Sequence, residues 1–113
     1  MLFRSIIAFG SDAPVEDANP FLGLYAAVTR KSLTDDKVFF ASQTIKIQDA
    51  LNSYYTNAAY AEFNENNKGK IKQGYLADFI VLEKSIFEDN YNNLKNIKVL
   101  KTFVGGKNIF STL

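Results

Sequence analysis

A short apolar run near the start of the chain, residues 5–9 (SIIAF), constrains the fold more than any other feature. Gly10 bounds it, and the polar turn Ser11-Asp12-Ala13-Pro14 follows at once. A short apolar run without polar alternation is typical of a strand buried on both faces, as in a parallel sheet. The run therefore predicts a buried strand whose carboxyl end carries Asp12.

The segment after this turn has the signals of a helix. Asn19 is a favourable N-cap, and Pro20 suits the first helical position, where its missing N–H costs nothing. Apolar side chains then recur at the spacing of one helix face: Phe21, Leu24, Tyr25 and Val28. We expect Arg30 and Lys31 in the last turn, where cations interact well with the helix dipole.

The middle of the chain predicts more helix and the end predicts strands. A second helix is expected over residues 47–55 and a third from Thr56 to about Phe63, before the solvated connector 64–70. Residues 76–82, 97–104 and 107–110 read as strands, the last two joined by a Gly105-Gly106 type I′ turn. A parallel-type strand beside antiparallel-type strands predicts pieces of two different sheets.

Composition excludes several classes of function. The 113 residues are 47% hydrophobic, which suffices for one packed domain, and the net charge of +1 comes without a basic stripe, so nucleic-acid binding is not expected. No apolar stretch approaches the roughly 18–20 residues of a membrane span, so we expect no membrane partner and a cytoplasmic location. Cysteine and histidine are both absent, so any hydrolytic site built here must use carboxylates, hydroxyls and lysines.

Three ordered segments together resemble a known family. They are GSDAPVEDANPFLGLYAAVTR (residues 10–30), IQDALNSYYTNAAYAEF (47–63), and GKIKQGYLADFIVLEKSIF (69–87) followed by VLKTFVGGKNIF (99–110). Their order and spacing resemble the C-terminal end of the amidohydrolase superfamily, in the YtcJ-like branch (amidohydrolase family 3). The resemblance covers the chain from about Ile6 to Phe110.

The resemblance implies an α/β fold: the last strand and helices of a (β/α)8 TIM-barrel metal-dependent hydrolase, plus strands of the accessory β-sandwich. Residues 1–66 would belong to the barrel and residues 67–113 to the sandwich. Such enzymes carry a divalent metal, commonly zinc, at the carboxyl ends of the barrel strands, where that fold places its catalytic groups. In the strand LADFIVL, Asp78 would be a structural residue.

The resemblance also implies a catalytic role for Asp12 at the end of the eighth strand, as a metal ligand that takes a proton from the attacking water. The simpler alternative is a turn-forming aspartate. Glu16 and Asp17 suggest a carboxylate pair with Asp12, although solvated loop charges are the more common reading. Arg30 is a candidate for binding a substrate carboxylate, with a helix-terminal cation as its alternative.

The family's metal-binding histidines have no counterpart here, and a (β/α)8 barrel needs about 250 residues. We therefore expect a C-terminal fragment of an enzyme that hydrolyses non-peptide C–N bonds in a small amide-type substrate, inactive and without bound metal when isolated. The alternative is a non-catalytic α+β chain that self-associates through exposed apolar faces.

Overall fold

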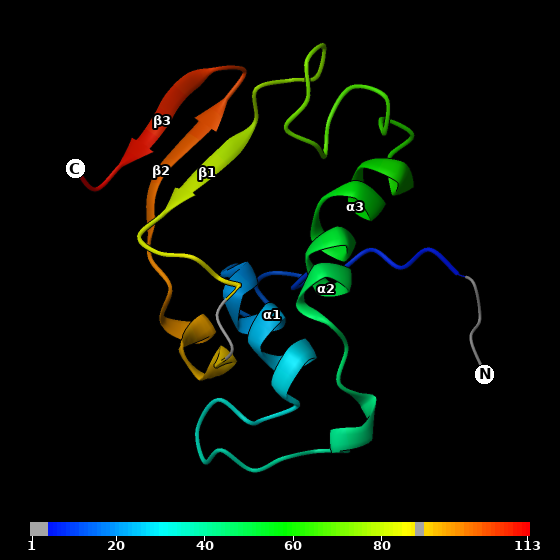
Figure 1. Cartoon of the computed structure of the whole chain (residues 1–113), viewed down its shortest axis with the longest axis vertical. Helices are drawn as coiled ribbons and strands as arrows, with labels where there is room; N and C mark the ends of the chain where they lie inside the picture. Colours follow the sequence, from blue (N-terminus) through cyan, green and yellow to red (C-terminus); the bar gives the residue numbers. More distant parts are fainter. Residues whose placement is uncertain (1–4, 88–89) are drawn as a thin grey trace.

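A computed structural model describes residues 5–87 and 90–113 of the chain. The arrangement is mixed α/β, with the helices and the sheet in different parts of the molecule (Figure 1). In chain order the elements are α1 (Pro20–Thr29), the 3-10 helix η1 (Ala41–Gln43), α2 (Ile47–Tyr54), α3 (Thr56–Ala61), β1 (Phe79–Leu82), the 3-10 helix η2 (Tyr91–Asn96), β2 (Val99–Val104) and β3 (Lys107–Ser111).

Helix α1 begins where its capping residues predict. The Asn19 side chain accepts a hydrogen bond from the Phe21 N–H at 3.0 Å, and Pro20 is the first helical residue. The helix ends at Thr29, because Arg30 adopts a left-handed conformation (φ 55°) and its N–H bonds back to the Ala26 carbonyl. The prediction that Arg30 and Lys31 lie in the last turn is therefore wrong.

Helices α2 and α3 are separated at Tyr55, whose backbone (φ −111°, ψ −80°) leaves the helical region. This confirms the predicted interruption near Thr56. Helix α3 ends at Ala61 rather than at Phe63, which lies beyond the helix with a positive φ. The polar connector that follows packs against α3 at Gly69, where an added Cβ would come within 2.9 Å of both the Ala59 side chain and the Tyr55 carbonyl.

The helices enclose a continuous apolar core. Its buried members come from α1, α2 and the η2 region: Phe21, Leu24, Tyr25, Val28, Ile47, Ala50, Leu51, Leu94 and Ile97. The Tyr25 ring is 1% exposed, and its hydroxyl donates to the Asp36 carboxylate at 3.2 Å. The Lys95 ammonium lies 5.0 Å from the centre of that ring and 3.8 Å from Asp36. One buried tyrosine thus connects α1, the loop that follows it, and η2.

The strands form one antiparallel sheet in the order β1-β2-β3. Phe79 and Phe103 are cross-strand partners whose rings stack at 4.6 Å. Gly105 and Gly106 both have positive φ, as the predicted type I′ turn requires, and the Asp78 carboxylate accepts the Gly105 N–H at 2.7 Å. Strand β2 begins at Val99 and not at Ile97, because Ile97 is buried in the helical core.

The prediction of a buried, parallel-type strand at residues 5–9 is wrong for this chain. The segment is extended and runs past α2 on the side away from the sheet (Figure 1). Its Phe9 N–H bonds to the Ser53 carbonyl at 3.0 Å, and the Asn57 side chain donates to the Ile7 carbonyl at 2.9 Å. A strand needs a neighbouring strand for its ladder of hydrogen bonds. Within residues 5–87 and 90–113, no strand lies beside this segment.

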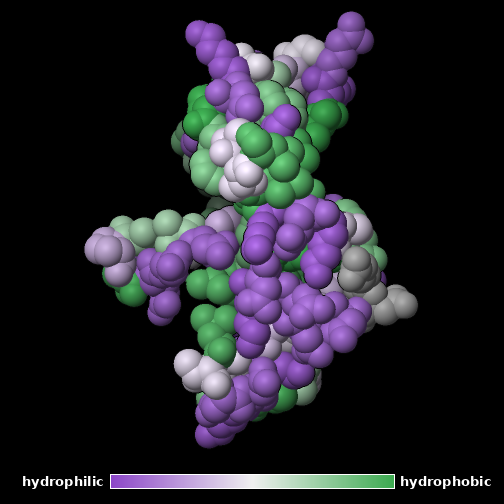
Figure 2. Space-filling model, turned by 90° about the vertical axis from the view of Figure 1, so that its left-hand side faces the viewer, coloured by the Kyte–Doolittle hydropathy of each residue, from purple (hydrophilic) through white to green (hydrophobic). Residues whose placement is uncertain are grey.

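Apolar side chains remain exposed on the part of the molecule that holds the sheet (Figure 2). Both faces of this three-stranded sheet keep partly or fully exposed side chains, and every residue of β3 is exposed. The large exposed apolar residues here are Val81, Val104, Ile109 and Phe110. Among the described residues, no helix has the length and apolar character that crossing a bilayer requires.

Candidate functional site

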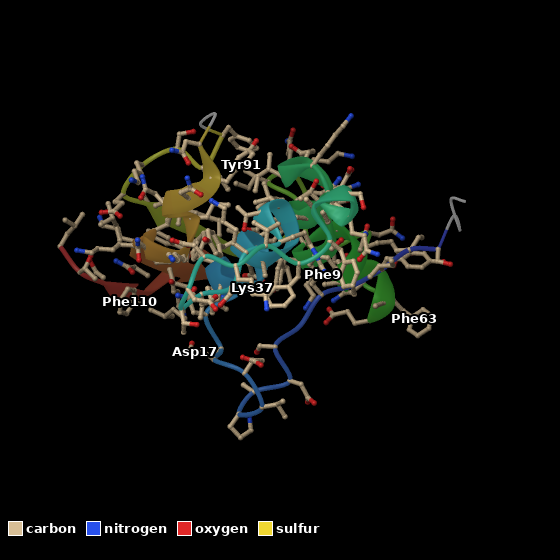
Figure 3. All side chains as sticks on the ribbon, turned by 90° about the horizontal axis from the view of Figure 1, so that it is seen from below. Phe9, Asp17, Lys37, Phe63, Tyr91 and Phe110 are labelled. Atoms are coloured by element: carbon tan, nitrogen blue, oxygen red, sulfur yellow. The ribbon has the colours of Figure 1, made fainter. Side chains whose placement is uncertain are left out.

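Asp12 lies in a tight turn at the end of the extended N-terminal segment. Its carbonyl accepts the Val15 N–H at 2.9 Å, and the Ser11 carbonyl accepts the Glu16 N–H at 3.3 Å. The loop around this turn projects away from the body of the molecule (Figure 3, Asp17 labelled), and the Asp12 side chain is exposed. Asp12 has φ 51°, a conformation that aspartate adopts more readily than most residues.

The described part of the chain does not by itself fit a metal centre. A catalytic zinc site takes three protein ligands and a structural site takes four. Residues 5–87 and 90–113 contain no group of three or more His, Cys, Asp or Glu side chains placed to hold an ion. The exposed carboxylate of Asp12 fits the chemistry of a single ligand.

A cavity of about 280 Å³ lies beside the Asp12 turn, and we call it the loop cavity. The turn, α1, the start of the segment after α1, and the end of α2 supply its walls. Its polar lining consists of Ser11, Glu16, Asp17, Asn19 and Tyr54. Its remaining lining consists of Gly10, Leu22, Gly23, Ala26 and Leu33. The lining residues include two acidic residues and no lysine or arginine.

Tyr54 is held in this cavity by two neighbours. Its ring packs edge-on against Phe9, with the ring centres 5.5 Å apart and the planes at 79°. Its hydroxyl lies directly over Gly23, where an added Cβ would overlap it. Burial raises the pKa of the Tyr54 hydroxyl above its ordinary value of 10.0, so this group stays protonated at neutral pH.

The acidic wall of the loop cavity is ordered by hydrogen bonds. One Asp17 carboxylate oxygen accepts the Asn19 N–H at 2.8 Å, directly before α1. The Glu16 N–H bonds to the Ser11 carbonyl, which closes the turn from the other side. The two carboxylates therefore lie on a backbone fixed at both ends.

Arg30 is engaged elsewhere. Its Nε–H donates to the Phe39 carbonyl at 3.0 Å, and the Phe39 N–H donates to the Arg30 carbonyl at 2.8 Å. These bonds hold the loop after α1, and Arg30 does not line the loop cavity.

Sequence reasoning also missed Tyr54 and Leu33 as cavity residues. Tyr54 matched the apolar spacing of a helix face, and no local signal linked it to the Asp12 turn.

A second cavity, of about 230 Å³, lies between the start of α3 and the sheet. Its lining includes Tyr55, Lys70 and Asp78. Burial raises the pKa of Tyr55 above 10.0. Because Asp78 already accepts the Gly105 N–H, this carboxylate serves the hairpin. The loop cavity is the one beside the predicted catalytic residue.

Comparison with known proteins places the chain in a family. The sequence model described as "Amidohydrolase family" matches residues 4–110. The protein LONG AFTER FAR-RED 3 of Arabidopsis thaliana is 35% identical over 95% of this chain and 18% of its own length. The protein YtcJ of Bacillus subtilis (strain 168) is 33% identical over 93% of this chain and 20% of its own length.

A more distant relative is the N-substituted formamide deformylase of Arthrobacter pascens, 25% identical over 88% of this chain and 18% of its own length. No solved structure matches the chain. The chain spans about a fifth of the length of the curated relatives that it matches. The family match over residues 4–110 confirms the resemblance of the three ordered segments. The chain belongs to the amidohydrolase family, in its YtcJ-like branch (amidohydrolase family 3).

Proposed function

We propose that this chain is the C-terminal part of a metal-dependent amidohydrolase that cleaves non-peptide C–N bonds in a small amide-type substrate. Residues 1–66 would complete a (β/α)8 barrel, and residues 67–113 would contribute strands to the accessory β-sandwich. The observation that carries the proposal is the family match over residues 4–110, with relatives about five times as long. The printed name of one relative, a formamide deformylase, supports a substrate of the amide class.

Asp12 is the residue of this chain that we assign to the chemistry. A divalent cation in such a centre lowers the pKa of water to about 7. The Asp12 carboxylate would be one ligand among several, the others coming from outside the described residues. It would take the proton from the attacking water and deliver it to the leaving nitrogen. Its exposed position at the end of an apolar extended segment leaves the carboxylate open to such partners.

The test is the substitution Asp12→Asn, made in a polypeptide that contains this segment and is as long as the complete members of the family. We expect the rate of amide hydrolysis to fall by about 10²- to 10⁴-fold, the range for loss of a positioned proton-transfer group. Asp35→Asn is the matched control, since Asp35 is an exposed aspartate of the loop after α1. Near-normal turnover of Asp12→Asn would end the assignment.

Exposed apolar residues favour a second candidate, a non-catalytic chain that self-associates. Ile6 and Ile7 are 55% and 58% exposed, and Ile109 on β3 is 63% exposed. Large exposed apolar surfaces mark interaction sites. Sedimentation velocity of the 113-residue chain should therefore show dimers or larger species. The double variant Ile6→Lys/Ile7→Lys should shift the mass towards the monomer, and a compact wild-type monomer at all concentrations would contradict this candidate.

A further inference from the structure

The extended N-terminal segment, residues 5–9, is held by helices. Within the part of the chain that the structure describes, no strand lies beside it. Two hydrogen bonds from distant positions fix it to the end of α2 and the start of α3. The Phe9 N–H donates to the Ser53 carbonyl at 3.0 Å. The Asn57 side-chain amide donates to the Ile7 carbonyl at 2.9 Å.

The break between α2 and α3 makes both hydrogen bonds possible. Because Tyr55 leaves the helical region, the last carbonyls of α2 have no partner within that helix. The Ser53 carbonyl is one of these, and the Phe9 N–H supplies a donor for it. The same break places Asn57 in the first turn of α3, where its side chain reaches the segment as a separate anchor.

The amide of Asn57 holds Ile7 through its nitrogen. A backbone carbonyl can only accept a hydrogen bond, so the Nδ2 group has to face it. The Thr56 hydroxyl lies 3.4 Å from Asn57 Oδ1 and 3.3 Å from the Asn52 carbonyl, and a donor at this place supports the same orientation of the amide. An aspartate at position 57 would keep the shape of the side chain and replace the donor by an oxygen, so this anchor would be lost.

Both anchors lie close to Asp12 along the chain. Three backbone steps separate Phe9 from Asp12, so their Cα atoms lie within about 11 Å of each other. Phe9 lies where the projecting loop leaves the body of the molecule (Figure 3), and its ring packs edge-on against Tyr54. The place of the Asp12 carboxylate relative to the helices therefore depends on how the segment is held at Ile7 and Phe9.

From this arrangement we infer that Asn57 is a positioning residue for the reaction assigned to Asp12. The inference rests on the proposed function. A proton-transfer group works only when it is held near the productive geometry, and a misplacement of about 1 Å can lower the rate about 10²-fold. Asn57 acts through the backbone at Ile7 and supplies no proton of its own: it fixes the segment from which Asp12 is presented.

The first experiment measures amide hydrogen exchange over residues 5–12 of the 113-residue chain by mass spectrometry. Asn57→Asp should speed this exchange by about twofold to tenfold, because one of the two bonds that hold the segment is lost. Asn57→Ala, which adds no charge, should do the same. Exchange within α1 should stay at its wild-type rate, which shows that the helical core is intact.

Asn66→Asp is the matched control, since it makes the same change at an exposed asparagine of the connector after α3. It should leave the exchange of residues 5–12 unchanged. Unchanged exchange of this segment in both Asn57 variants would overturn the inference.

The second experiment is a cycle of single and double variants in the polypeptide of complete family length. Asn57→Asp should lower kcat by about 10- to 10²-fold, because the carboxylate of Asp12 is displaced. It should change KM by less than about threefold, because the anchor does not hold the substrate. With Asp12→Asn already present, adding Asn57→Asp should cost nothing further, since no carboxylate remains to be positioned. Asn57→Gln, which keeps the amide donor on a longer stem, should recover part of the lost kcat.

A merely structural role of Asn57 would lower the rate alike in the presence and absence of the Asp12 carboxylate. Equal losses in the two backgrounds, or a loss confined to KM, would therefore overturn the inference. Either result leaves the proposed function standing as long as Asp12→Asn alone lowers the rate. Near-normal turnover of Asp12→Asn would instead end the proposed function, and the positioning role with it.

Discussion

The helical region and the sheet region of this molecule differ in how completely they bury their own apolar residues. Leu24 and Tyr25 of α1 are 2% and 1% exposed and lie in a core shared with α2 and η2. In the sheet, β3 is exposed along its whole length. The helices carry their own core, whereas the sheet meets that core at one end only, through Ile80, Leu82 and Val99.

The difference shows that local pattern and burial are separate properties. A hairpin forms from turn chemistry and cross-strand pairs. Covering its faces needs a second layer, because stable domains bury a sheet against another element. In the family, the proposed sandwich would supply that layer. In the isolated chain, another copy could supply it, as the self-association candidate requires.

The largest expected effect contrasts two truncations of apolar side chains. Leu24→Ala should lower the free energy of unfolding by about 2–5 kcal/mol, because it leaves a cavity in the helical core and alanine preserves the helix. Ile109→Ala on β3 should change it by less than about 0.5 kcal/mol, because the side chain is exposed. Urea denaturation of both variants measures the contrast. Equal losses would show that β3 is covered in solution.

A smaller effect is expected at the hydrogen bond from Tyr25 to Asp36 at the edge of the helical core. Tyr25→Phe removes the hydroxyl that donates to Asp36 and keeps the ring under Lys95. The free energy of unfolding should fall by about 0.5–1.5 kcal/mol. Tyr60→Phe is the control, because Tyr60 is half exposed on α3. Thermal unfolding followed by circular dichroism gives both values, and equal losses would refute a special role for Tyr25.

The smallest expected effect is a pH dependence at the end of α3. A hydrogen bond from the Lys68 side chain, helped by Asn64, lowers the pKa of Glu62 below its ordinary value of 4.5. Because the folded-state pKa is the lower one, this stabilisation is complete above pH 4.5 and is lost as the pH falls through the folded-state value.

Thermal unfolding of the wild type and of Glu62→Gln should therefore differ slightly at pH 7 and converge under acid conditions. Lys68→Met should remove most of the same difference, because it takes away the main hydrogen-bond donor. A difference between wild type and Glu62→Gln that is constant from pH 7 to acid would rule out this ion pair as the cause.

Features encoded over a few neighbouring residues were predictable from the sequence. The α1 start at Asn19-Pro20 and the Gly105-Gly106 turn depend on backbone preferences of those residues and are confirmed. The prediction of a strand at residues 5–9 failed for a different reason. An apolar run indicates that the segment needs burial, but it does not show that a neighbouring strand is present to pair with it. The prediction that Arg30 lies in the last turn failed because Arg30 itself adopts a left-handed conformation, which ends the helix at Thr29.

In the candidate site, too, only the features encoded by neighbouring residues were predictable from the sequence. The turn at Asp12 follows from its Gly, Ser, Asp and Pro residues. The catalytic role of Asp12 stays a prediction, which the Asp12→Asn variant tests. The wall formed by Tyr54 depends on how α1 and α2 pack against residues 5–9, and such contacts between distant segments leave no local pattern.

The contact between Gly23 and the Tyr54 hydroxyl makes the shape of the loop cavity depend on one glycine. Because any Cβ at position 23 would overlap that hydroxyl, a single methyl group there would push the phenol ring aside. Because Tyr54 both lines the loop cavity and packs against Phe9, such a shift would alter the shape of the cavity and this ring contact together. Position 23 is thus the place where the smallest side chain, one methyl group, would reshape the wall of the loop cavity.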